Sequence, residues 1–551
     1  MATQYLLPNM REFFSECRKR LGWLCGLSGV CALIAVLVAA VPPFLAMPPW
    51  GDVTLYDVAA REIRSGGVHY RDVFDTNPPG FVWSLAVLRS AIGPSYEVLR
   101  AIDLCIVGFI CVMLSRLMGT GFARSMWFFV AAALFYPFTS EFNHIQRDVW
   151  MMLPAVLATS LRANRTMDRS FWPSVGEGIL WGCAVWFKPH CIFPAAVVWL
   201  VTCRGNGKIR SIAFDLLGQL TGGLLIGAVG VFYLTLSGTW PHFLDVMLNW
   251  NPEYAGNLFD ELPQRLPWNI NYFGGWDLVH LAAVPLACYN LWKGGNSNRG
   301  LAALYLGWYA QAMLLQRVFP YVHLPETILA LALIGQRIPV GIPVLGWFLI
   351  QPLLALIPAY AEEAQSNHFL APHPLMEKHL YDVWPRCLRE GSSAAMRNKL
   401  GQLNSAHCGT DWVQLELVAD FLRTANLKDG ELICWHDGTH RLYLLLNVKP
   451  GLRYMHLGTT WAFESKREAI AEEVRSKEAR FVVSDLRLLS GDMTRVLAPG
   501  EGGKWYRLPA WIPESQRKCF PWNQRIVFRS GRYVVHEMGR PVGCIQASLE
   551  E

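Results

Sequence analysis

The chain has 551 residues, of which 52 % are hydrophobic and only 17 % are charged, whereas soluble domains average about 25 % charged residues. The formal net charge of +6 comes without any long run of Lys or Arg, so composition argues against a nucleic-acid partner. Most long apolar runs lie in residues 23–360, and residues 361–551 resemble an ordinary soluble domain. We therefore predict a membrane domain at 1–360 and a soluble domain at 361–551.

The N-terminal apolar run, residues 23–46, is too long for the core of a signal peptide and long enough to span a membrane. Arg18, Lys19 and Arg20 precede it. Positive residues favour the cytoplasmic side, so we expect a cytoplasmic N-terminus.

Ten further apolar segments follow, several of them shorter than the roughly 20 residues of a full crossing. Short spans are tolerated where the bilayer thins or neighbouring helices shield them. With the N-terminus inside, each loop expected in the cytoplasm carries Arg or Lys. The further segments are 96–115, 125–139, 148–161, 175–189, 190–203, 212–236, 277–292, 301–318, 322–336 and 339–360.

Two segments decide this count of about eleven spans. Residues 179–203 are either one span with Lys188 in its middle or two short spans that meet at Pro189. Two spans keep the basic residues of 204–210 inside, so we favour them. Residues 81–92 are too short to cross and carry Arg89, so we predict an interfacial helix. Outer loops at 47–95 and 237–276 and an extracytoplasmic C-terminal domain follow.

The C-terminal part alternates helical and strand patterns, as a small α/β domain does. Its five cysteines allow one or two disulfides in an oxidising compartment, and the odd number leaves at least one thiol free. These cysteines are Cys387, Cys408, Cys434, Cys519 and Cys544. We predict helices at 411–426, 438–446 and 465–477, strands at 431–436, 452–457 and 480–485, and a final hairpin at 525–538.

Two acidic residues at span ends are candidates for catalysis. Asp52 directly follows the first span, where a carboxylate costs desolvation energy unless it has a partner or a task. Alternatively, it lies in a solvated loop and caps a helix that begins near Thr54. Asp148 either faces Asp52 as a second acid or caps the next span, with Arg147 reaching to the interface.

Basic residues at two other junctions are candidates for binding an anion. Lys188, beside His190, can bind a lipid phosphate as a point charge, or can simply extend to the interface. Arg317 can contact phosphate in a bidentate manner, or can belong to an interfacial aromatic and basic belt with Tyr321 and His323. Under the predicted topology all these groups face one side, which suits group transfer from an anionic lipid phosphate.

The order of these motifs resembles the GT-C superfamily of polytopic glycosyltransferases, particularly bacterial relatives of protein O-mannosyltransferases and lipid A aminoarabinose transferases. The resemblance rests on Asp52 after the first span, the Pro78-Pro79 motif, the Arg147-Asp148 pair, the Gly182–Lys188 segment and the Tyr321–His323 segment. Relatives commonly carry Lys before Pro-Pro, where this chain has Asn77. The fold that it implies is a polytopic α-helical membrane domain of GT-C type with an appended extracytoplasmic α/β domain.

The resemblance also implies roles for individual residues. Asp52 would be the catalytic base or would orient the acceptor, and Asp148 would be the second acid, near the donor sugar. A single displacement would invert the anomeric centre. The donor phosphate would be bound by Lys188, Arg317, His323 and Arg147. The substrate cavity would include Asp57, Asn77, His144 and Tyr321.

The sequence therefore predicts a glycosyltransferase of the cell (inner) membrane that moves a sugar from a polyprenyl-phosphate donor to a lipid, glycan or protein acceptor outside the cytoplasm. No soluble cofactor is implied. Carboxylates suit Mg²⁺ or Mn²⁺, but no metal ligand set is identifiable. Two alternatives are a transporter or lipid flippase, which would place charges near the bilayer midplane, and a non-catalytic membrane scaffold or sensor.

Overall fold

The computed structural model describes residues 3–165, 171–203, 209–255, 273–316, 319–354, 379–401, 410–455, 463–485 and 524–538. The chain folds into two compact units, each assembled from segments that are far apart in sequence. Unit 1 comprises residues 1–45, 99–228 and 258–389, and unit 2 comprises residues 46–98, 229–257 and 390–551. The division at residue 360 that the sequence suggests stays a prediction.

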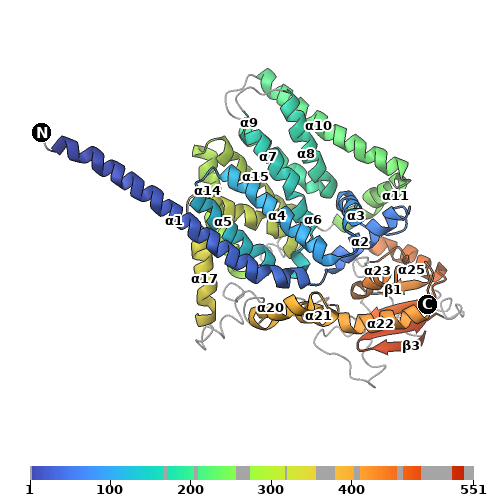
Figure 1. Cartoon of the computed structure of the whole chain (residues 1–551). Helices are drawn as coiled ribbons and strands as arrows, with labels where there is room; N and C mark the ends of the chain where they lie inside the picture. Colours follow the sequence, from blue (N-terminus) through green and yellow to red (C-terminus); the bar gives the residue numbers. More distant parts are fainter. Residues whose placement is uncertain are drawn as a thin grey trace. The chain divides into compact units, whose positions relative to one another are not determined.

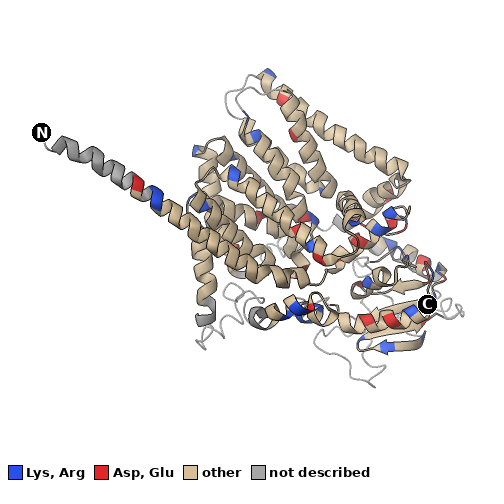
Figure 2. Cartoon of the chain, viewed as in Figure 1, with Lys and Arg blue, Asp and Glu red and all other residues tan. Residues whose placement is uncertain are grey.

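Unit 1 is built from apolar helices (Figure 1), and Figure 2 shows few charged residues along α8 and α10. Each of the eleven predicted spans coincides with a helix in the described residues. These helices are α1 Thr3–Ala46, α4 Tyr96–Met118, α5 Phe122–Phe135, α6 Arg147–Trp150 with α7 Met152–Ala163, α8 Phe171–Phe187, η3 Pro189–Cys191 with α9 Ile192–Cys203, α10 Ile209–Leu236, α14 Val279–Lys293, α15 Asn296–Leu315, α16 Leu324–Gly335 and α17 Gly341–Leu354.

Three of these helices, within the part of the chain described, are long and apolar enough to cross a membrane: Lys19–Ala46 of α1, Tyr96–Met118 and Ile209–Leu236. The other eight fall short in length or in apolar character, so the number of crossings stays a prediction. Short elements η1 Tyr136–Phe138, η2 Glu141–Asn143, η5 Gly274–Leu278, η6 Pro320–His323 and α20 His379–Glu390 complete the described part of unit 1.

Hydrogen bonds to Asp215 show that α8 and α9 form an antiparallel hairpin, because the start of one and the end of the other meet there. Ser174, near the start of α8, donates its hydroxyl to Asp215 Oδ1 at 2.5 Å. Trp199, near the end of α9, donates its indole N–H to Asp215 Oδ2 at 3.1 Å. The chain therefore reverses around Pro189, which confirms two helices over 179–203 instead of one continuous helix.

The same end of the hairpin carries a buried cluster of two arginines and two acids. Arg162 Nε lies 2.6 Å from Glu177 Oε1, and Arg162 Nη2 lies 3.0 Å from Asp215 Oδ2. Arg165 pairs with both acids, at 2.9 Å and 3.1 Å. Both arginines belong to a loop that the sequence assigns to the cytoplasm. In the structure they pair with acids, with Arg162 buried and Arg165 partly buried.

Lys188 lies at the opposite end of α8 from this cluster. The 17 residues of α8 separate the two ends by about 25 Å at 1.5 Å per residue. Asp148 and Arg162 are likewise at opposite ends of the α6–α7 segment. The Asp148–Lys188 end and the Arg162 end of unit 1 are therefore distinct, as the sequence expected of the two membrane faces.

Glycines allow α8 and α10 to pack backbone against backbone. A Cβ added at Gly222 would lie 2.1 Å from the Val175 carbonyl oxygen, and one at Gly178 would lie 2.1 Å from the Gln219 carbonyl oxygen. Such distances are far inside van der Waals contact. Small residues that let helix backbones approach closely are typical of membrane helix pairs.

Gly222→Ala is therefore expected to destabilise the protein, because a backbone carbonyl cannot rotate away as a side chain can. Overpacking of this kind costs about 1–3 kcal/mol. Gly227→Ala, on the same helix, is the matched control, since nothing lies within 4 Å of its added Cβ. Thermal denaturation in detergent should lower the melting temperature of Gly222→Ala alone. Equal melting temperatures for both variants would contradict the close packing.

The described part of unit 2 contains a four-stranded mixed sheet in the order β1-β2-β4-β3. β1 Leu432–Cys434 and β2 Phe481–Asp485 are parallel, and β4 Tyr533–Glu537 pairs antiparallel with β2 and with β3 Arg525–Ser530. The helical elements are α2 Gly51–Arg64, α3 Gly80–Ile92, α11 Trp240–Asp245, η4 Val246–Trp250, α12 Asn251–Ala255, α21 Ala394–Gly401, α22 Trp412–Thr424, η7 Asp437–Thr439, α23 Arg441–Leu446, η8 Glu464–Lys466 and α25 Arg467–Ser476.

The predicted strands at 431–436 and 480–485, the final hairpin and the predicted helices of the tail are confirmed within the described residues. The strand predicted at 452–457 is wrong over residues 452–455, which form no ladder. Leu452 and Tyr454 still point into the core, and the Arg453 carbonyl accepts the Phe74 N–H at 2.9 Å. Cys387 and Cys434 are buried free thiols. Cys408, Cys519 and Cys544 lie outside the described residues.

Three segments far apart in sequence share the core of unit 2. Phe74 of the first loop packs against Trp250 of the 229–257 segment, with ring centroids 4.6 Å apart, and Trp250 packs against Tyr454 of the tail at 5.7 Å. Arg61 of α2 donates to the carbonyls of Tyr443 and Val448, each at 2.6 Å. All three segments were predicted to lie outside the cytoplasm. Segments that contact one another must lie on the same side of the membrane, so their contact agrees with that prediction.

Candidate active site

A buried ion pair joins two of the predicted site residues in unit 1. Asp148, in the first turn of α6, has no exposed surface, and Lys188, between α8 and η3, is 8 % exposed. Lys188 Nζ lies 2.8 Å from Asp148 Oδ1 and also donates to Gln316 Oε1. Lys188 is thus paired inside the protein, and its place relative to the membrane interface stays a prediction. The N-cap of α6 is Gln146, so the alternative that Asp148 caps this helix is wrong.

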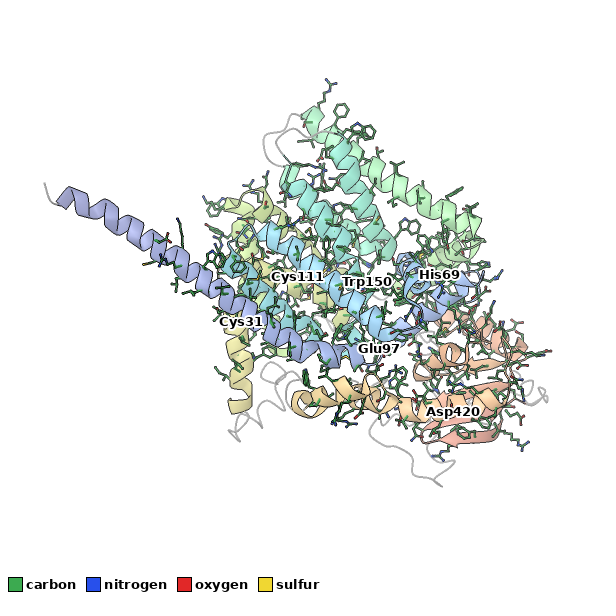
Figure 3. All side chains as sticks on the ribbon, in the orientation of Figure 1. Cys31, His69, Glu97, Cys111, Trp150 and Asp420 are labelled. Carbon is green, nitrogen blue, oxygen red and sulfur yellow. The ribbon has the colours of Figure 1, made fainter. Side chains whose placement is uncertain are left out.

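A second cation faces the same carboxylate. Arg147 Nε lies 3.7 Å from Asp148 Oδ2, and only 8 % of Arg147 is exposed. Gln316, at the end of α15, donates in turn to Gln311 at 2.7 Å. Lys188 is thus tied to both α6 and α15, and Asp148 lies between two cations. Trp150, labelled in Figure 3, lies in α6 together with Arg147 and Asp148.

His323 belongs to the same region. Its element, η6, packs against α6 and η2, and the charges of Asp148 and Lys188 act on its imidazole. Nδ1 of His323 lies 2.6 Å from Glu326 Oε1. Tyr321 is buried, with its ring 5.2 Å from Phe142 and stacked 5.4 Å from Phe319.

His144 is held by protein groups on both ring nitrogens. Nδ1 lies 3.0 Å from Arg100 Nη1, and Nε2 lies 3.0 Å from both Thr139 Oγ1 and the Tyr136 carbonyl. Because Arg is always a donor, Nδ1 accepts and Nε2 carries the hydrogen. These contacts anchor the loop before α6, and a role of His144 in a substrate cavity stays a prediction.

Asp57 and Asn77 lie in unit 2. Both oxygens of Asp57 accept from Arg89, each at 2.8 Å, and Tyr96 adds a hydroxyl at 2.5 Å. The Arg89 side chain of α3 is thus buried against Asp57 instead of facing water or headgroups. Asn77 donates its amide to Asp75 Oδ1 at 2.7 Å. The structure shows these two residues in structural hydrogen bonds, and their predicted place in a cavity stays untested.

Asp52 lies in the first turn of α2, which begins at Gly51 with Trp50 as its N-cap. Its proposed role as the N-cap of this helix is therefore wrong. A carboxylate in the first turn still interacts favourably with the helix dipole. Arg317 lies outside the described residues, so its role as a phosphate ligand stays a prediction.

Three buried polar residues near this site escaped the sequence reasoning: Arg100, Asp103 and Glu326. Asp103 accepts from Tyr136 at 2.6 Å and from Trp150 at 2.7 Å. Each is a charged residue inside an apolar run. Burying a charge in a membrane costs free energy unless it has a partner, so their positions could have indicated buried polar contacts. The described residues contain no group of three or more His, Cys, Asp or Glu placed to hold a metal ion.

No protein-family model and no curated protein matches the chain. Among solved structures, an oligosaccharyltransferase from Archaeoglobus fulgidus, in complex with zinc and sulfate, aligns with 84 % of this chain and 68 % of its own, at 14 % identity and a TM-score of 0.41. The oligosaccharyltransferase AglB from the same organism, bound to an inhibitory peptide and a dolichol-phosphate, aligns over 84 % and 70 %, at 12 % identity and a TM-score of 0.43. Both belong to the GT-C superfamily that the sequence resembles.

Proposed function

We propose that the chain is a membrane glycosyltransferase of the GT-C type that transfers one sugar from a polyprenyl-phosphate donor to an acceptor outside the cytoplasm. The observation that carries the proposal is the buried Asp148–Lys188 pair with Arg147 beside it. It lies at the end of apolar helices, where the phosphate of a lipid-linked substrate would reside.

Charge balance supports an anionic ligand at this place. The carboxylate of Asp148 faces two cations, Arg147 and Lys188. A phosphate oxygen at Lys188 would be attracted by both cations and, as a leaving group, would be stabilised by the ammonium.

The transfer itself needs a proton acceptor as well as this anion site. The acceptor hydroxyl would attack the anomeric carbon, its proton would pass to Asp52, and the bond from that carbon to the phosphate oxygen would break. The single displacement inverts the anomeric centre. The role of Asp52 rests on the family resemblance and on its place directly after α1.

The orientation of the enzyme rests on the basic residues of the predicted cytoplasmic loops. The Asp148–Lys188 end of unit 1 would face the exterior of the cell membrane, and the Arg162 cluster the cytoplasm. The exterior assignment also suits a donor that needs no nucleotide at the site.

Asp148→Asn is expected to lower the amount of product at least roughly 100-fold, the usual scale for losing a group that acts on developing charge. The test is a mass-spectrometric comparison of cell-envelope lipids, glycans and proteins from a deletion strain that expresses the wild type or a variant. A hexose or pentose mass should be absent from the deletion and Asp148→Asn strains. Wild type and the surface variant Asp420→Asn should restore it.

Asp52→Asn serves as the second test variant, because Asp52 is partly exposed and its loss leaves the buried ion pair intact. Membrane levels of every variant are compared by immunoblot. An envelope profile unchanged by deletion of the gene would refute the transferase. Full restoration by both Asp variants would instead support the transporter or scaffold.

A further inference from the structure

The buried carboxylate of Glu326 contacts Nδ1 of the His323 imidazole. Glu326, in the first turn of α16, is 1 % exposed and His323 is 2 % exposed. The 2.6 Å separation between His323 Nδ1 and Glu326 Oε1 is that of a strong, charge-assisted hydrogen bond. Thr327 fixes the backbone of the same turn by donating to the His323 carbonyl at 3.0 Å.

This contact fixes which nitrogen of His323 carries hydrogen. An isolated negative charge among apolar helices is expensive, so the dyad is stable as a neutral pair that shares one proton between Glu326 and Nδ1. Wherever the shared proton lies, Nδ1 is engaged and Nε2 carries a hydrogen. A carboxylate that binds one ring nitrogen of a histidine commonly fixes the tautomer and the orientation of the ring.

Several ionisable groups surround the dyad, and they decide how its environment responds to pH. Asp148 and Lys188 act on His323 from α6 and from the turn after α8, and Asp277 acts from η5. Among the described residues, the other groups are His280 of α14, on which His323 acts, Tyr305 and Tyr309 of α15, on which Glu326 acts, and Arg147, which acts on Lys188.

We propose that Glu326 is a positioning residue, which keeps the Nε2–H of His323 as a hydrogen-bond donor to the phosphate that Lys188 binds. The proposal rests on the proposed function, since it assigns Glu326 a part in binding the donor of that reaction. A hydrogen bond to a charged group supports roughly a 10- to 100-fold effect, so the loss should be measurable.

Glu326→Leu removes the carboxylate without adding a polar group to the apolar interior. With no partner at Nδ1, the neutral ring divides between two tautomers and Nε2 loses its hydrogen part of the time. The product found in the deletion-strain comparison should fall roughly 10- to 100-fold near neutral pH. In more acidic medium the deficit should shrink, because a protonated imidazole carries hydrogen on both nitrogens. The measured quantity is the ratio of variant to wild-type product at each external pH.

Three further variants separate positioning from mere structural support. Glu326→Gln can donate its amide hydrogen to Nδ1 and should retain more product than Glu326→Leu. His323→Gln offers a donor that does not titrate, so its deficit should be independent of pH. Thr327→Ser changes the same turn but keeps the hydroxyl that donates to the His323 carbonyl, so it should match the wild type. All product amounts are normalised to the level of each full-length protein in the membrane.

The outcomes distinguish this proposal from the proposed function. If the wild-type gene restores no product to the deletion strain, the transferase itself is wrong. If wild type restores it but Glu326→Leu shows no deficit, the phosphate at Lys188 is not contacted by His323, as when a phospholipid headgroup occupies the site. A deficit of Glu326→Leu that is equal at every pH would also overturn the positioning role.

Discussion

Asp215→Asn is expected to destabilise the protein by roughly 3–5 kcal/mol, the range for breaking a buried ion pair on one side. Asp215 is fully buried and accepts hydrogen bonds from Arg162, Arg165 and Ser174. An Asn has one acceptor oxygen, and its amide would face a guanidinium. Glu177 would then be the one carboxylate of the cluster against two cations, of which Arg162 is buried and Arg165 partly buried. The melting temperature of the full-length protein in detergent measures the effect.

Asp420→Asn is the matched control, because Asp420, labelled in Figure 3, lies on the exposed side of α22 in a surface pair with Arg423. Exposed pairs contribute about 0–1 kcal/mol. The double variant Asp215→Asn with Arg165→Gln removes one cation together with the lost charge and should recover part of the stability. If the double variant is less stable than Asp215→Asn alone, charge compensation is not what the cluster provides.

The apolar helices of unit 1 were predictable because hydrophobic runs and a proline are local signals. Pro189 marked the reversal between α8 and α9 correctly, and the final hairpin of the tail followed from alternation around Gly531-Arg532. Gly531 adopts a φ of 52° in that turn, which glycine accommodates without strain. These features depend on neighbours in sequence.

Partners of charged residues were not predictable in the same way. Arg162 was interpreted as a cytoplasmic loop charge, yet its partners Glu177 and Asp215 come from two other helices. Arg89 was interpreted as an interfacial residue, yet Asp57 lies opposite it from α2. Hydropathy shows that a segment is apolar but not which face it turns to a neighbour, so the pairing of buried charges needed the fold.

The candidate site likewise contains residues that the sequence named and one partner that it missed. The sequence placed Asp148 with Arg147, Lys188 and His323 at separate junctions on one membrane face, together with Asp52 and Arg317. The structure brings the first four close together in unit 1. Glu326 was missed, although a Glu within the apolar run of α16 is itself a signal of a buried partner. It lies three residues after His323, the spacing at which helix side chains meet.

Acidification below about pH 6 is expected to destabilise unit 2 progressively, because three of its histidines are buried in neutral form. Burial lowers the pKa of His69 to about 3 and that of His436 to about 4, from an ordinary 6.5. Burial also lowers the pKa of His536 to about 4. In an unfolded chain these rings would take up protons near pH 6.5, whereas the folded unit keeps them neutral. Their contribution is therefore complete above pH 6.5 and is lost as the pH falls toward 4.

The size of this effect follows from 1.36 kcal/mol per pH unit for each group. At pH 5 each histidine is 1.5 units below its unfolded pKa, so each removes about 2 kcal/mol and the three together about 6 kcal/mol. A domain's whole stability is about 5–15 kcal/mol, so the loss is a large share of it. His69, labelled in Figure 3, stacks on Tyr70 with ring centroids 4.0 Å apart.

Trp250 and Trp435 lie in the same core cluster as Tyr70, so near-ultraviolet circular dichroism and limited proteolysis of the full-length protein report on this unit. His536→Gln is the test variant, since its amide can keep the 2.9 Å hydrogen bond to Ser484 without titrating. Its unfolding midpoint should move to lower pH than that of the wild type. An identical acid midpoint for both proteins would show that His536 does not carry this sensitivity. A wild-type unit that stays folded at pH 4 would contradict the burial of all three neutral rings.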